Sequence, residues 1–206
     1  MGYLTIKDRA EASFIEKHSE FIGYLAPVTT NDEAVAFINE IKSKHRKATH
    51  NVYAYILRDD NIVRYSDDGE PQGTAGVPVL DVLKKRGLTD VCCVVTRYFG
   101  GILLGGGGLV RAYSHATSIA VDSASIMDMC SCYQLKFSMD YTLYGKVNYI
   151  LPNFDIKILD TNFSNCVTIP LLVKVERFEE LNKKLIDVSN GSIVVEKSQE
   201  MFMDFN

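Results

Sequence analysis

The sequence predicts a mixed α+β protein of two domains. Strand and helix patterns first follow the order β-α-β-β-α-β-α, and after residues 128–132 a second series begins with the order β-α-β-β-α-β. With 206 residues, the chain is long enough to build two modest domains, each with its own core. We therefore expect one domain over residues 1–130 and another over residues 131–206.

The first domain opens with a strand at 19–28 and a helix within 30–47. Thr30 and Glu33 form a capping box at the start of this helix. Apolar residues follow at helical spacing on one face: Ala34, Phe37, Ile38 and Ile41. Residues 50–71 then predict two strands joined by a tight Asp-Asp-Asn turn.

The rest of the first domain contains two helices around one buried strand. A helix is expected over 75–87, ending at Gly87. The apolar run 90–96 predicts a buried strand, and a further helix begins near Gly107. Its core-facing residues are Leu109, Ala112, Tyr113, Ala116 and Ile119.

The second series of elements has the order of a ferredoxin-like, split βαβ domain. Its expected elements are a strand at 133–142, a helix at 143–153, strands at 154–163 and 166–175, a helix at 176–189 and a strand at 192–205. Asn190 and Gly191 are typical of the end of the last helix.

Composition excludes several classes of protein. The formal net charge is −4 and neither half is basic, so any contact with nucleic acid must come from a local patch. The odd number of cysteines and the absence of metal-ligand spacing favour reduced, structural cysteines. No segment has the apolar length of a membrane span or the form of a signal peptide, so we expect a cytoplasmic protein without membrane contact.

Residues 96–113, TRYFGGILLGGGGLVRAY, hold six glycines in nine positions. A glycine-rich turn before a helix presents unpaired N–H groups and the positive end of the helix dipole to an anion. Arginine on either side favours the same ligand. The candidate anion-site residues are Arg97, Gly100, Gly101, Gly105, Gly106, Gly107, Gly108, Arg111 and His115. The alternative is that the glycines only permit sharp bends and close packing.

The stretch 66–78, SDDGEPQGTAGVP, is the candidate metal site. Asp67, Asp68 and Glu70 are of the type that holds hydrated Mg²⁺. The same stretch is also typical of a simple turn, with Asp68-Gly69 for the bend and Gly73-Thr74 capping the next helix.

Cationic residues gather at the C-terminal end of the first helix, where Lys44, His45, Arg46, Lys47 and His50 are candidate phosphate contacts. Cations are also favoured at a helix C-terminus for electrostatic reasons alone. No Walker A loop, nucleophile elbow or zinc-protease motif is present in the sequence, and no catalytic residue is assigned.

Four stretches resemble the IMPACT/YigZ family: HNVYAY at 50–55, SDDGEPQGTAGVP at 66–78, VVTRYFGGILLG at 94–105 and GGLVRAY at 107–113. The resemblance implies an N-terminal ribosomal-protein domain-2-like α/β fold, shared with domain IV of elongation factor G and with GHMP kinases. It also implies a C-terminal ferredoxin-like domain similar to domain V of elongation factor G. Eukaryotic relatives regulate translation through an additional N-terminal domain, for which we expect no room before residue 19.

Two functions remain open. The first is a non-enzymatic RNA- or ribosome-binding protein linked to translation regulation, which uses the glycine-rich loop and its arginines and requires no cofactor. The second is a Mg²⁺-dependent nucleotide or phosphate-ester enzyme with a GHMP-kinase-like cleft. The second requires the acidic loop and the glycine-rich loop to face one pocket of small-molecule size.

Overall fold

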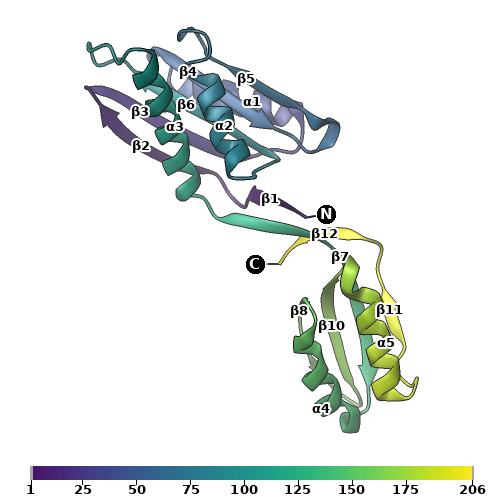
Figure 1. Ribbon diagram of the computed structural model, residues 1–206. Helices are drawn as coiled ribbons and strands as arrows, with labels where there is room; N and C mark the ends of the chain where they lie inside the picture. Colours follow the sequence, from purple (N-terminus) through teal and green to yellow (C-terminus); the bar gives the residue numbers. More distant parts are fainter. Residues whose placement is uncertain (1, 206) are drawn as a thin grey trace. The chain divides into compact units, whose positions relative to one another are not determined.

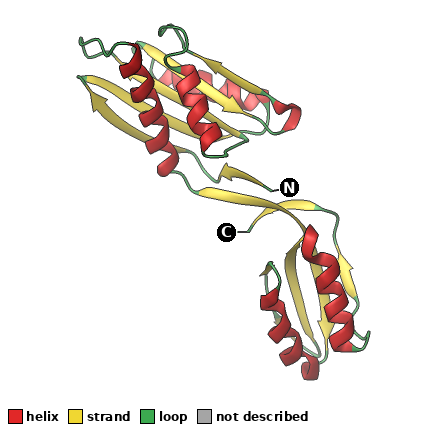
Figure 2. Ribbon diagram, viewed as in Figure 1, coloured by secondary structure: helices red, strands yellow, loops and turns green. Residues whose placement is uncertain are grey.

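The computed structural model describes residues 2–205, which form two compact units. One unit holds residues 3–127, and the other holds residues 128–205 together with Gly2. Each unit combines a β-sheet with helices (Figures 1 and 2), so the predicted α+β class with two domains is confirmed.

The unit of residues 3–127 is built on a five-stranded sheet with the order β2-β3-β6-β4-β5 and antiparallel pairing throughout. The strands of this sheet are β2 (Ala10–Glu16), β3 (Ser19–Pro27), β4 (His50–Ile56), β5 (Val63–Ser66) and β6 (Val91–Tyr98). Strand β1 (Tyr3–Ile6) belongs to the same unit but not to this sheet. The helices of this unit are α1 (Asn31–Lys44), α2 (Gly76–Lys85) and α3 (Gly106–Asp122), with a 3₁₀ turn, η1, at Asp59–Asn61.

This sheet separates two apolar cores. Helix α1 packs on one face against the side chains of Tyr24, Tyr55 and Val94, whereas α2 and α3 cover the other face. Strand β6 supplies both cores because successive side chains point to opposite faces. Cys92 and Cys93 therefore lie in different cores; both are fully buried, and burial raises the pKa of Cys93 to about 12. These two cysteines are inert core residues, as the sequence predicts.

The second unit has the ferredoxin-like order. Its elements are β7 (Ile126–Met139), α4 (Tyr141–Ile150), η2 (Leu151–Asn153), β8 (Ile156–Ile158), β9 (Asn162–Phe163), β10 (Val167–Lys174), η3 (Val175–Arg177), α5 (Phe178–Ser189), β11 (Val195–Lys197) and β12 (Met201–Asp204). Strands β11, β7, β10 and β8 lie in this spatial order and pair antiparallel. The predicted βαββαβ arrangement is confirmed.

Some predicted boundaries are wrong. Strands β1 and β2 precede the first strand that the sequence predicts. The expected strands 154–163 and 192–205 are each divided into two short strands. The helix predicted from residue 143 begins two residues earlier, at Tyr141.

Candidate functional site

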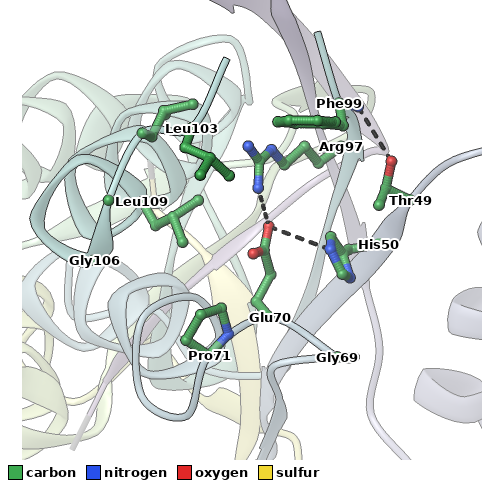
Figure 3. A pocket seen from close by; sticks show the side chains of 12 residues that line it. Thr49, His50, Gly69, Glu70, Pro71, Arg97, Phe99, Leu103, Gly106 and Leu109 are labelled. Atoms are coloured by element: carbon green, nitrogen blue, oxygen red, sulfur yellow. Dashed lines mark hydrogen bonds and ion pairs between the residues drawn. The ribbon is translucent and has the colours of Figure 1, made fainter. Parts of the chain in front are cut away.

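A pocket of about 420 Å³ lies where the acidic loop meets the glycine-rich loop (Figure 3). We call it the Arg97 pocket. It is lined by Thr49, His50, Gly69, Glu70, Pro71, Arg97, Phe99, Leu103, Leu104, Gly105, Gly106 and Leu109. The two loops that the sequence singled out therefore face one pocket of the size that small ligands occupy.

A buried ion pair lies in this pocket. The Nη1 atom of Arg97 on β6 lies 2.6 Å from Oε1 of Glu70, and both side chains are almost fully buried. The hydroxyl of Tyr113 on α3 donates to the same oxygen at 2.8 Å. Burial and the Glu70 carboxylate both raise the pKa of Tyr113, so the phenol remains protonated and acts as a donor.

One nitrogen of the Arg97 guanidinium has no hydrogen-bond partner among the described residues. Its Nη2 atom lies 3.4 Å from the Ser19 hydroxyl. The central carbon of the guanidinium, Cζ, lies 5.4 Å from the ring centroid of Phe21 and 5.4 Å from that of Phe99. Its Nε atom is buried without a hydrogen-bond partner. A buried N–H without a partner is costly, so this atom is a local source of instability in the ion pair's surroundings.

His50 adds a second nitrogen to the pocket. Its Nδ1 lies 2.8 Å from the Asp68 carbonyl oxygen, which can only accept, so Nδ1 carries the hydrogen. The other ring nitrogen, Nε2, lies 3.8 Å from Oε1 of Glu70. The imidazole is thus held in one orientation at the edge of the pocket.

The glycines of the loop have different roles. A Cβ at Gly100 would lie 2.0 Å from the backbone carbon of His18, so only glycine permits this approach of the loop after β6 to the β2–β3 turn. Gly101 and Gly105 have φ angles of +85° and +70°, which side chains disfavour. Gly106, Gly107 and Gly108 form the first turn of α3, whose N-terminus has no side-chain cap. This end of α3 lies at the pocket through Gly105 and Gly106.

Arg111 and His115 do not line the Arg97 pocket. They are exposed and belong to a neighbouring hollow of about 290 Å³, which also contains Lys17. Leu104 lines both hollows. The prediction that Arg97 and Arg111 bind the same anion is therefore wrong for this structure, because the two arginines line different hollows.

The three carboxylates of the acidic loop are not brought together as one ligand set. Asp67 accepts from the backbone N–H groups of Gly73, Ala75 and Gly76 at the start of α2. Asp68 pairs with Lys42 at 2.7 Å and accepts from the Asn51 amide. Within residues 2–205 no group of three His, Cys, Asp or Glu side chains is placed to hold a metal ion. The turn alternative is closer to the structure, but its capping residue is wrong: Asp67 holds the start of α2, whereas the Thr74 hydroxyl donates to the Pro71 carbonyl oxygen.

The cationic segment after α1 does not form one surface. His45 is buried, with Nε2 at 2.7 Å from the Tyr24 hydroxyl and Nδ1 at 2.9 Å from that of Tyr98. Lys44 is paired with Glu11, whereas Arg46 and Lys47 are exposed. His50 is the member of this group that lines the Arg97 pocket. Only scattered members of the predicted patch are thus available to a ligand.

Sequence reasoning missed Ser19, Phe99 and Tyr113 as residues of the site. The sequence predicts Tyr113 on the core face of its helix, and it does pack there, but its hydroxyl also donates to Glu70. A tyrosine on an otherwise apolar face is a signal for a buried acceptor, because a buried phenol needs a hydrogen-bond partner.

Comparison with known proteins shows the family of this chain. The Impact N-terminal domain model matches residues 17–121, which include the whole Arg97 pocket, and a domain of unknown function (DUF1949) matches residues 137–192. IMPACT family member YvyE of Bacillus subtilis is 37% identical over 98% of this chain and 94% of its own length. The chain belongs to the IMPACT family.

Other relatives show the same membership. IMPACT family member YigZ of Escherichia coli is 32% identical over 86% of this chain and 88% of its own. A crystal structure of a hypothetical protein is similar with a TM-score of 0.61 and 30% identity, covering 94% of this chain and 96% of that one. The IMPACT homolog of Dictyostelium discoideum matches 59% of this chain but only 35% of its own length. In this IMPACT family member, none of the helices within residues 2–205 is long and apolar enough to cross a membrane.

Proposed function

We propose that this protein is a non-enzymatic RNA-binding protein that holds one unpaired nucleotide in the Arg97 pocket. The observation that carries the proposal is the composition of this pocket. Apolar walls and an exposed aromatic ring lie beside a buried guanidinium and an uncapped helix N-terminus. A nucleotide has the same two parts, a flat base and an anionic phosphate.

The walls suit a base. The ring of Phe99 is 45% exposed and the side chain of Leu103 is 82% exposed, although both are large apolar groups. Stacking of a base on an exposed aromatic ring contributes about 1–3 kcal/mol and tolerates different bases. This favours an unpaired nucleotide over a base in a duplex, whose faces are already stacked.

The rim suits a phosphate. The first turn of α3 is built from Gly106, Gly107 and Gly108, and no side-chain cap occupies its N–H groups. These groups and the helix dipole favour an anion. Arg97 lines the same pocket and adds a fixed positive charge, which Glu70 partly balances.

The neighbouring hollow supports a chain of nucleotides over a free one. Lys17, Arg111 and His115 line this hollow, which adjoins the Arg97 pocket at Leu104. Exposed cations next to a base pocket are suited to the next phosphate of a strand. The family resemblance supports the ribosome as the source of this RNA.

A second candidate is a Mg²⁺-dependent enzyme acting on a nucleotide or phosphate ester. One observation favours it: the acidic loop and the glycine-rich loop line one pocket of small-molecule size. For Mg²⁺ to bind, Asp67, Asp68 or Glu70 would have to release the protein donors that hold them now. This makes the enzyme the weaker of the two candidates.

Titration of fluorescent single-stranded and hairpin RNA at about 50 and 200 mM salt tests the proposal. We expect single-stranded RNA to bind more tightly, and both Phe99→Ala and Arg111→Ala to weaken binding. Arg64→Ala is the matched control because Arg64 is an exposed arginine on β5, outside both hollows. Stabilisation by ATP or GTP that requires Mg²⁺, without RNA binding, would favour the enzyme instead.

A further inference from the structure

A groove between α4 and α5 has no role in the function proposed above. It is lined by Gly145, Lys146, Tyr149, Ile150, Lys184 and Val188 and has a volume of about 730 Å³. Tyr149 is 82% exposed, which places it among the most exposed large side chains of the chain. The groove lies wholly within the ferredoxin-like unit.

We propose that this groove is a second contact site for the same single-stranded RNA, with a base stacked on Tyr149 and phosphates beside Lys146 and Lys184. This inference rests on the function proposed above. In this proposal the C-terminal domain itself contacts the RNA.

The charge of the groove favours an anionic ligand. Lys146 and Lys184 are exposed, and no ion pair or hydrogen bond engages either of them within the described residues. The residues that line the groove include no carboxylate. Lys146 and Tyr149 are three positions apart on α4, so they project from the same side of the helix.

Gly145 is an independent indication of a ligand. It lies in the middle of α4, where glycine is unfavourable relative to alanine. A Cβ at this position would meet no atom within 4 Å, so packing within the domain does not require glycine. Its effect is to leave the backbone open next to Tyr149, where a flat base can approach closely.

RNA fits this surface better than a protein does. Lysine is depleted at the cores of protein interfaces, whereas aromatic rings flanked by cations are the usual platform for single strands. The apolar floor, Ile150 and Val188, is small. A single ring with two free ammonium groups is sufficient for one nucleotide but not for the centre of a stable protein interface.

The test uses the full chain and a fluorescent single-stranded RNA of about 25 nucleotides, with affinity measured at several salt concentrations. We expect Tyr149→Ala to weaken binding about fivefold or more, and Tyr149→Phe to bind like the wild type because stacking is retained. Lys184→Ala should lower the slope of log K against log salt by about 0.7, the value for one phosphate of a single strand. Lys183→Ala is the matched control, since Lys183 is an exposed lysine on α5 that does not line the groove.

The outcomes are distinguishable. If Phe99→Ala weakens binding but Tyr149→Ala and Lys184→Ala bind like the wild type, this inference is overturned and the proposed function stands. If the groove instead binds a protein partner, Tyr149→Ala and Lys184→Ala would likewise bind RNA like the wild type. If the wild-type chain binds no RNA, both are overturned. Far-ultraviolet circular dichroism of each variant confirms that these exposed substitutions leave the fold intact.

Discussion

At the scale of single residues, the Arg97–Glu70 pair is the feature on which the site depends. Two opposite charges lie 2.6 Å apart with almost no solvent contact, and Tyr113 donates to the same carboxylate. Such a pair is costly to desolvate, but removing one partner leaves a buried charge without compensation. The pair therefore fixes the position of the guanidinium in the pocket.

Glu70→Ala should lower the free energy of unfolding by about 3–5 kcal/mol, because it leaves Arg97 buried and unpaired. Glu40→Ala is the control: Glu40 also lies 2.6 Å from an arginine, Arg9, but both side chains are exposed. An exposed pair contributes at most about 1 kcal/mol. Urea denaturation measures both, and equal losses would contradict the assignment of Glu70.

His45 predicts a pH dependence of stability. Burial is the largest effect that lowers its pKa from 6.5 in the folded chain, and the charge of Lys44 adds to it. Below pH 6.5 the unfolded chain therefore binds this proton more readily than the folded chain does. Stability from this residue is complete above pH 6.5 and is lost as the pH falls toward the lowered value.

The measurement is urea unfolding of the wild type and His45→Gln at about pH 7.5 and 5.5. The wild type should lose more stability between these values than the variant does. Other titrating groups cancel in this comparison. An identical loss in both proteins would show that His45 does not contribute.

Gly100→Ala should destabilise the N-terminal domain by about 3 kcal/mol, because the added Cβ has no room against the His18 backbone. Gly106→Ala is the matched control, since its Cβ would lie at an ordinary 3.8 Å from the Thr74 methyl group. We expect this control to stay within about 1 kcal/mol of the wild type. Thermal unfolding of both variants checks the difference, and similar melting temperatures would contradict it.

At the scale of elements, hydrophobic periodicity predicts most of the fold. The capping box of Thr30 and Glu33 forms as expected, and Asn190 ends α5 in the left-handed conformation. Strands β1 and β2 escape prediction because they are mostly half-buried or exposed. Strand β2 alternates, but its inward side begins with the small residues Ala10 and Ala12, so the alternation gives only a weak apolar signal.

Asp67 shows that an aspartate in a predicted metal site can instead hold the start of a helix. Its carboxylate accepts three backbone N–H groups at the start of α2, which has no cap from its own N-cap residue. Asp67→Ala should therefore destabilise the chain by about 2 kcal/mol, the upper value for loss of a helix cap. Asp32→Ala, in the first turn of the capped helix α1, is the control and should cost less. Urea denaturation distinguishes them, and a larger loss for Asp32→Ala would contradict this role.

At the scale of the whole molecule, the sequence predicts two domains, the α+β class and the glycine-rich loop as the central feature. It does not predict which candidates meet. Arg97 and Glu70 are 27 positions apart and come together only because β6 and the loop before α2 lie at one pocket. Arg111 lies closer to Arg97 in sequence but is in the second turn of α3 and lines a different hollow.

The net charge of −4 also limits how the chain can bind RNA. Attraction at long range is weak, so affinity must come from local contacts such as a stacked base and a few phosphates. This is consistent with two small platforms, one on each domain, and with a preference for unpaired nucleotides.

Photocrosslinking tests the central claim most directly. Single-stranded RNA that carries 5-iodouridine is bound to the full chain, irradiated, and the modified residue is identified by mass spectrometry. The account predicts a crosslink at Phe99 that is lost when unlabelled RNA competes. Bound RNA that crosslinks only to residues outside the Arg97 pocket would contradict it.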